Sequence, residues 1–267
     1  MKYREAAVAG RFYPAAAKEL RNQLAGYFSE QAILPEVPKA LIVPHAGYFY
    51  SGAVAAKAYR LLGNGKQHFS RVVLFGPSHH VALEGCAVPS SDVFLTPTGE
   101  VTIDRESVAL LLSQGLAVES DQAHHWEHSL EVQLPFLQYC LEDFTLLPVV
   151  VGRDLQGYVK RILAAIAQLP ETLIVVSSDL SHYHPYSEAN EIDADTIQRV
   201  LSFGSNINPE RACGCNAING LLEYAREQHW EIKCVNYTNS GDVMADHENR
   251  APEPSEGVVG YASFVLF

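Results

Sequence analysis

Five short runs of apolar residues constrain the fold of this 267-residue chain more than any other feature of its sequence. Each run is four to nine residues long and rich in β-branched side chains, the pattern of strands that are buried on both faces. Between most of them lie segments with apolar residues every three to four positions, the spacing of an amphipathic helix. The runs cover residues 40–43, 71–75, 145–151, 172–177 and 258–266.

Strands that alternate with helices predict an α/β fold, with helices on both faces of a mixed, mostly parallel sheet. The helical spacing is found at 15–28, 51–62, 129–141, 154–168, 189–203 and 212–227. Residues 84–104 interrupt the alternation, and the turn residues Pro97 and Gly99 within them indicate a β-hairpin. Because no linker, repeat or low-complexity segment divides the chain, we expect residues 1–267 to form a single domain.

Charge and composition argue against several kinds of partner. The formal net charge is −12 and no block is rich in Lys and Arg, so we expect binding neither to nucleic acid nor to a membrane. Residues 1–14 lack the apolar core of a signal peptide, and no apolar run is long enough to span a bilayer. The five cysteines are odd in number and scattered, which fits reduced thiols. We therefore expect a cytoplasmic protein.

Polar side chains follow three of the predicted strands. His45 comes after the first, His79 and His80 after the second, and Asp179 and His182 after the fourth. In an open α/β sheet, ligands bind beyond the carboxyl ends of the strands. A single histidine at a strand end is usually structural, but three such ends at one sheet edge indicate a site for a divalent transition metal.

Three histidines and two glutamates lie in the segment AHHWEHSLEVQLP. His128 and Glu131 are three residues apart and would share one face of a helix, where both could reach the predicted site. Ser129 and Glu131 also fit an ordinary helix start, so both interpretations stay open. For His124 and His125 we expect a structural role.

Two further segments carry weaker signals. Cys213 and Cys215 flank a glycine at a predicted helix start, where a cysteine tends towards the thiolate that attacks as a nucleophile or binds soft metals. One of the two is expected to be a small buried residue. Asp242 lies in a predicted polar loop at 236–243, where it either faces the same cleft or caps a turn.

Six motifs occur in order along nearly the whole chain: AGRFYP, PHAGYFYSG, GPSHH, EHSLEVQLPFL, SSDLSH and CGCNAI. Together they resemble the Memo family, whose bacterial members are called AmmeMemoRadiSam system protein B. The resemblance implies the fold of the class III extradiol dioxygenases of the LigB type, which are non-haem iron enzymes. The family name also implies a functional link to AMMECR-type and radical SAM proteins.

The resemblance further implies the metal ligands. The family's metal positions match His45, His79 and Cys213, a choice that spacing alone leaves open between neighbouring histidines and cysteines. Asp179 and His182 are implied to line the same pocket, where His182 is the better general base.

A cysteine ligand departs from LigB-type dioxygenases, which bind Fe(II) through two histidines and a carboxylate. Thiolate favours copper(I), or iron with an altered redox potential, so ring cleavage does not follow from the shared fold. The leading hypothesis is a metalloprotein with iron or copper, zinc being possible, that performs redox or oxygen chemistry on a small molecule or peptide. One alternative is a non-catalytic module that binds such a ligand, and another is a hydrolase with Cys213 as nucleophile and His182 as base.

Overall fold

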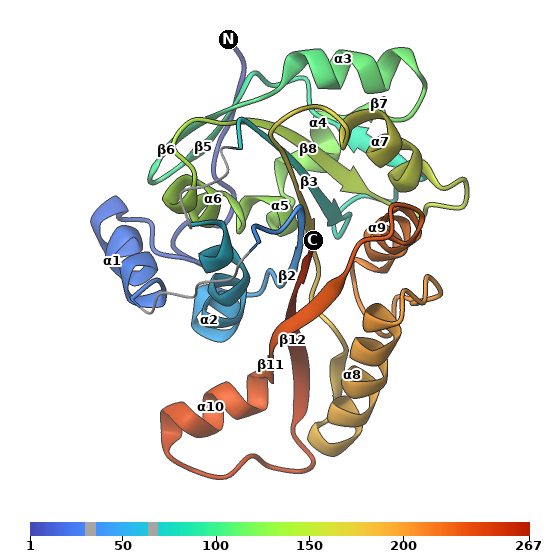
Figure 1. The fold of residues 1–267 in the computed structure, drawn as a ribbon. Helices are drawn as coiled ribbons and strands as arrows, with labels where there is room; N and C mark the ends of the chain where they lie inside the picture. Colours follow the sequence, from blue (N-terminus) through green and yellow to red (C-terminus); the bar gives the residue numbers. More distant parts are fainter. Residues whose placement is uncertain (30–35, 64–68) are drawn as a thin grey trace.

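A computed structural model describes residues 1–29, 36–63 and 69–267 of the chain. The strands of its larger sheet are β2 (Ala40–Val43), β3 (Arg71–Pro77), β4 (Cys86–Val88), β7 (Val118–Glu119), β8 (Thr145–Val151), β9 (Thr172–Ser177), β10 (His182–Pro185), β11 (Ile232–Asn239) and β12 (Gly257–Leu266). They lie in the order β10-β12-β2-β9-β3-β8-β4-β7, and β11 pairs with β12 (Figure 1).

The centre of this sheet is parallel, and its flanks are antiparallel. β2, β9, β3 and β8 pair in parallel, whereas β12 runs antiparallel to β2 on one side and β4 antiparallel to β8 on the other. Every residue of β2 is buried, as are all but the first residue of β3, β8 and β9, which explains their mostly apolar sequences. The predicted α/β fold with a mixed sheet is therefore confirmed.

A smaller sheet holds the predicted excursion. β5 (Val93–Thr96) and β6 (Gly99–Thr102) pair antiparallel, which confirms the hairpin expected at Pro97 and Gly99. β1 (Tyr3–Arg4) adds to β5 in parallel and thereby ties the N-terminal segment to the hairpin.

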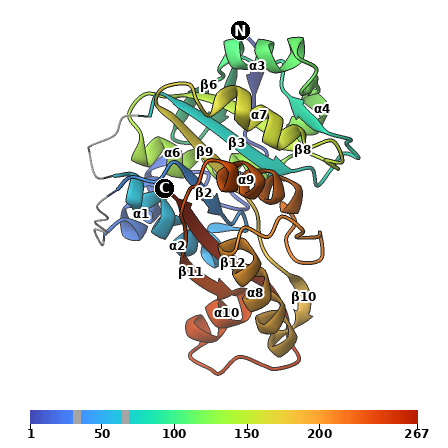
Figure 2. The same cartoon turned by 45° about the vertical axis from the view of Figure 1, so that its right-hand side comes forward.

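Helices cover both faces of the larger sheet, as predicted. They are α1 (Ala17–Tyr27), α2 (Tyr48–Tyr59), the 3-10 turn η1 (Arg60–Leu62), α3 (Arg105–Ser113), α4 (Asp121–His125), α5 (His128–Glu131), α6 (Leu134–Cys140), α7 (Tyr158–Ile166), α8 (Tyr186–Leu201), α9 (Cys215–Glu227) and α10 (Ser240–Glu248). Figures 1 and 2 show α1, α2, α5 and α6 on one face and α7 and α9 on the other, while α8 and α10 pack beside β11 and β12.

Two segments differ from the prediction. The single helix expected at 129–141 is split into α5 and α6, because Pro135 lies in the first turn of α6 and has no N–H to continue the preceding helix. The polar loop expected at 236–243 is instead the end of β11 and the start of α10. There Asn239 caps the helix by accepting a hydrogen bond from the Asp242 N–H at 2.9 Å.

Among the helices in the three described ranges, none combines the length and the apolar character that crossing a bilayer requires.

Candidate metal centre

The candidate site lies where the adjacent strands β2, β9 and β3 end. His45, Asp179 and His79 each follow the last residue of one of these strands by two positions. α5 brings His128 to the same edge, and it can approach β3 closely because Gly76 has no side chain. A Cβ at Gly76 would lie 2.5 Å from the Ser129 Oγ, so any larger residue would push α5 away.

His45, His79 and His128 form a three-histidine group. Each can offer one ring nitrogen such that all three nitrogens lie within 4.8 Å of one another. The ring centroids are 5.3 Å apart for His45 and His79, 5.4 Å for His45 and His128, and 4.6 Å for His79 and His128. The rings come from three separate chain segments, so the fold rather than local sequence brings them together.

The hydrogen bonds of His45 fix which of its ring nitrogens carries the proton. Its Nδ1 lies 2.9 Å from the Ser177 Oγ, which already donates its only hydrogen to the Ser129 carbonyl at 2.6 Å. The Gln133 Nε2 also donates to this hydroxyl, at 2.9 Å. The Ser177 oxygen must therefore accept from His45 Nδ1–H, which leaves His45 Nε2 with a free lone pair.

Glu127 fixes the ring proton of His79 on Nδ1, as Ser177 does for His45. Its buried carboxylate accepts from the His79 backbone N–H at 2.7 Å and lies 2.9 Å from the His79 Nδ1, which therefore donates. It also accepts from the Ser129 N–H and so caps α5. Burial alone would raise the pKa of Glu127, but the hydrogen bonds that it accepts from His79 and Ser129 outweigh burial and hold that pKa well below the usual range. A carboxylate behind an imidazole is the usual support of a metal-binding histidine.

The site favours neutral imidazoles at two positions. Burial, with the neighbouring histidines, holds the pKa of His45 well below its ordinary value and lowers that of His128 to about 4. The His128 ring packs against Phe12 from the N-terminal segment, with centroids 4.7 Å apart. Near neutral pH both rings therefore present the neutral form, which is the form that binds metals.

Cys213 adjoins the group beside His45. Its Sγ lies 3.3 Å from the His45 Nε2 and accepts the Asp179 backbone N–H, also at 3.3 Å. Cys213 precedes α9, but the thiolate tendency expected at a helix start is not found, because burial and the Asp179 carboxylate raise its pKa. Cys215, the first residue of α9, is buried in the core, as expected for one of the two cysteines.

Asp179 and His182 are two further ionisable groups near His45. The Asp179 Oδ1 accepts the His45 backbone N–H at 2.7 Å, and its Oδ2 is 3.9 Å from the His45 Nε2. Burial raises the pKa of Asp179 to about 7, so this carboxyl can exchange a proton near neutral pH. His182, at the start of β10, is half-buried, and burial lowers its pKa.

The other predicted residues have different surroundings. Glu131 is directed at the N-terminal segment, where its carboxylate accepts from Arg4 at 2.6 Å and from the backbone N–H groups of Ala7 and Val8. Asp242 lies in the first turn of α10 and accepts from the Tyr186 hydroxyl at 2.7 Å. Neither carboxylate belongs to the three-histidine group.

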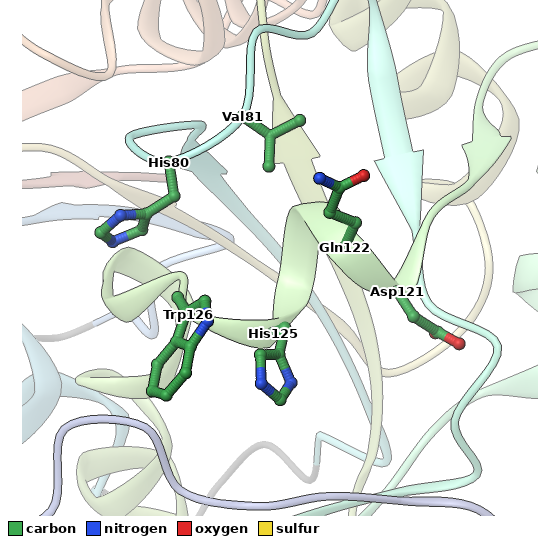
Figure 3. A pocket seen from close by; sticks show the side chains of 6 residues that line it. All are labelled: His80, Val81, Asp121, Gln122, His125 and Trp126. Atoms are coloured by element: carbon green, nitrogen blue, oxygen red, sulfur yellow. The ribbon is translucent and has the colours of Figure 1, made fainter.

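His80 is exposed, as is His79, but its ring is 6.1 Å from that of His128 and it does not belong to the three-histidine group. It borders a cavity of about 350 Å³ that Val81, Asp121, Gln122, His125 and Trp126 also line (Figure 3). In that view the Asp121 side chain points away from the other labelled side chains.

The donor set fits a transition metal. Imidazole suits zinc, copper, iron and nickel, and thiolate suits the softer ions among them. Nitrogen and sulfur ligands of one tetrahedral ion lie about 3.5 Å apart. The 3.3 Å between the Cys213 Sγ and the His45 Nε2 is close to this separation.

Sequence reasoning did not find Glu127 and Ser177, which orient the two strand-end histidines. Glu127 directly precedes His128, and no role for it was predicted from the sequence. Its position two residues before the predicted helix at 129–141 was the available signal, since a carboxylate there can cap the helix and still reach a neighbouring side chain. Ser177 gave no signal, because serine at the end of a buried strand is common.

Comparison with known proteins gives matches over nearly the whole chain. A family model described as Memo-like protein matches residues 4–265. A MEMO1 family protein from Methanosarcina mazei is 34% identical over 281 residues, covering 100% of both chains. Another, from Aquifex aeolicus, is 36% identical over 266 residues and covers 92% of this chain and 96% of its own. A crystal structure of an uncharacterised Escherichia coli K12 protein has a TM-score of 0.47 at 13% identity, covering 86% of this chain and 100% of its own.

Proposed function

The chain belongs to the Memo-like protein family, and we propose that it is a metalloprotein that performs redox chemistry on a small molecule at an iron or copper ion. The observation that carries this proposal is the group formed by His45, His79 and His128. At two of these positions the Nδ1–H is already used by Ser177 or Glu127, so that the Nε2 lone pair is the one available to a metal.

In this proposal the three histidines hold the ion and Cys213 supplies a fourth, softer donor. When bound, iron or copper supplies a centre that accepts electron pairs and changes its oxidation state. The Asp179 N–H that donates to the Cys213 Sγ stabilises negative charge on that sulfur. It thereby offsets part of the cost of deprotonating a buried thiol.

Asp179 and His182 are proposed to move protons at the site. With a pKa raised to about 7, the Asp179 carboxyl can hold a proton on Oδ2, near His45, or release it at physiological pH. Burial keeps His182 largely neutral near pH 7, so its imidazole is available as a base.

Metal analysis of protein purified without added metal tests the proposal. We expect stoichiometric iron or copper. Zinc alone would contradict the redox proposal and favour a hydrolase in which Cys213 is the nucleophile, since that thiol already lies beside the His45 Nε2. Protein that purifies without metal and does not take up iron or copper on addition would instead favour a module that binds a small molecule or peptide.

Glu127→Gln is expected to weaken metal binding by about 10- to 100-fold, because the charge that orients His79 and raises its basicity is lost. Competition with a chromophoric chelator measures the change, and thermal unfolding checks that the variant is folded. Glu119→Gln, at an exposed glutamate of β7, is the control. Equal affinities for the two variants would mean that Glu127 serves only to cap α5.

Cys213→Ser should weaken copper(I) binding at least about tenfold, whereas Cys215→Ser should leave it unchanged. The reason is that the Cys213 Sγ adjoins the His45 Nε2, while Cys215 is buried in the core. Titration against a copper(I) chelator measures both affinities. If Cys213→Ser binds copper(I) as tightly as the unmodified chain, the sulfur is not a ligand.

A further inference from the structure

The two residues proposed to move protons, Asp179 and His182, lie at the two ends of one short segment that connects β9 to β10. β12 holds the middle of this segment by two backbone hydrogen bonds. The Leu180 N–H donates to the Gly260 carbonyl at 2.8 Å, and the Gly260 N–H donates to the Ser181 carbonyl at 3.0 Å. These bonds use the Ser181 carbonyl but not the Ser181 N–H, which needs an acceptor from another element.

That acceptor is the carboxylate of Asp193, in the middle of α8. The Asp193 Oδ1 accepts the Ser181 N–H at 3.0 Å, and the Asp193 Oδ2 lies 3.0 Å from the Tyr237 hydroxyl of β11. Asp193 is 0% exposed. An aspartate is almost never fully buried unless its oxygens have partners, and one of the partners here belongs to the segment that ends at His182.

Gly260 provides the space for this carboxylate. A Cβ at Gly260 would lie 1.9 Å from the Asp193 Oδ2, so the carboxylate fills the volume that a side chain of β12 would otherwise occupy. α8 packs beside β12 along this stretch (Figure 2). Asp193 therefore contacts both the segment and the part of β12 to which the segment is bonded.

The backbone directly after His182 is strained. Tyr183 has a φ of +61°, in the left-handed region that bulky residues rarely adopt, and a bulge lies between His182 and His184. Tyr183 is 81% exposed, so burial of its own side chain does not offset the strain. Such a conformation persists only where the surrounding structure fixes the backbone, and the hydrogen bonds at Leu180 and Ser181 do so immediately before it.

We propose that Asp193 is a positioning residue of the metal centre, which sets through the Ser181 N–H where Asp179 and His182 lie. The inference rests on the proposed function, in which these two residues move protons. Asp193 contacts neither the metal ligands nor a substrate, and it acts only through the segment that it holds.

The segment also contacts two of the proposed ligand residues. Asp179 accepts the His45 backbone N–H at 2.7 Å and donates its own N–H to the Cys213 Sγ at 3.3 Å. A shift of the segment would therefore change the support of the metal ligands as well as the position of His182. Both effects can be measured without knowledge of the substrate.

Two measurements on the full chain test the proposal: the rate at which diethyl pyrocarbonate modifies His182, followed by peptide mass spectrometry, and the copper(I) affinity, from titration against a chelator. Asp193→Ala should raise the modification rate at least about threefold, because the half-buried His182 ring becomes more accessible when the segment is released. It should also weaken copper(I) binding at least about threefold, the effect of a lost supporting residue.

Two further variants separate positioning from general loss of stability. Asp193→Asn should stay within about twofold of the unmodified chain in both measurements, since an amide oxygen still accepts the Ser181 N–H. Its amide nitrogen can donate to the Tyr237 hydroxyl, which then donates to the Asn190 Oδ1, 3.0 Å away. Val200→Ala, which removes a fully buried apolar side chain from the same helix, should lower the melting temperature and change neither measurement.

Equal His182 modification rates in Asp193→Ala and Val200→Ala would overturn the proposal, because Asp193 would then support only the fold. Asp193→Asn behaving like Asp193→Ala would overturn it too, since the hydrogen bond to Ser181 would not be the cause. If Asp193→Ala does not fold, Tyr237→Phe replaces it and should still exceed Val200→Ala in modification rate; a rate equal to that of Val200→Ala refutes the proposal. An unmodified chain without copper(I) affinity would count against the proposed function, while the His182 rate still decides the role of Asp193.

Discussion

Replacement of His79 with alanine is expected to abolish stoichiometric metal binding, whereas replacement of the adjacent His80 should leave it nearly intact. The two side chains differ in their surroundings and not in their chemistry. Glu127 holds the His79 ring against His128, whereas the His80 ring lies 6.1 Å from that of His128 and does not belong to the three-histidine group. Loss of one of three imidazole ligands should lower the affinity by more than about 100-fold, beyond the effect of losing a supporting residue.

Metal content per chain, measured after gel filtration, gives the result, and thermal unfolding shows whether each variant still folds cooperatively. His45→Ala should lose the metal as well, but His45 is 1% exposed and also contacts Ser177, so this variant combines two effects. His79 is therefore the cleaner test. An equal loss of metal in His79→Ala and His80→Ala would refute the assigned ligand.

Glu131→Ala should destabilise the fold by about 3–5 kcal/mol, the cost of removing one partner from a buried ion pair. The Glu131 carboxylate is fully buried and accepts from Arg4, from the Tyr13 hydroxyl and from two backbone N–H groups. Its loss leaves the Arg4 guanidinium, 7% exposed, without its counter-ion and detaches the N-terminal segment from α5.

Urea unfolding measures this change in the free energy of unfolding. Glu131→Gln keeps a side-chain oxygen that can accept and should lie between the unmodified chain and Glu131→Ala. Glu100→Ala, at an exposed position of β6, is the control and should change stability by less than about 0.5 kcal/mol. A loss below about 1 kcal/mol in Glu131→Ala would mean that the ion pair contributes little.

The sheet could be predicted from the sequence because a strand that is buried on both faces is a continuous run of apolar residues. Residues 40–43 and 173–176 are apolar throughout, and both lie in central parallel strands. His45 and His79 were expected to lie close together because the carboxyl ends of parallel strands lie at one edge of the sheet. The division of 129–141 into two helices was missed because its apolar spacing continues through Pro135.

The parts of the site that sequence could not supply depend on contacts between distant segments. Glu131 has the spacing of a residue that shares a helix face with His128, yet its partner Arg4 lies 127 positions away. Whether the pKa of the Cys213 thiol is raised or lowered depends on its burial and on Asp179, which lies 34 residues earlier in the sequence. A local sequence motif gives no information about either of these two contacts.

The position of β12 has a consequence for synthesis of the chain on the ribosome. β12 is made after every other strand of the sheet, yet it lies inside the sheet, between β10 and β2, and also pairs with β11. Until residue 266 has left the ribosome, the edge of β2 that carries Leu41 and Ile42 has no partner strand. An apolar strand with a free edge can pair with other chains. Pairing of β12 with β2 therefore follows the synthesis of the other strands of this sheet, and until then the edge of β2 is open to pairing with other chains.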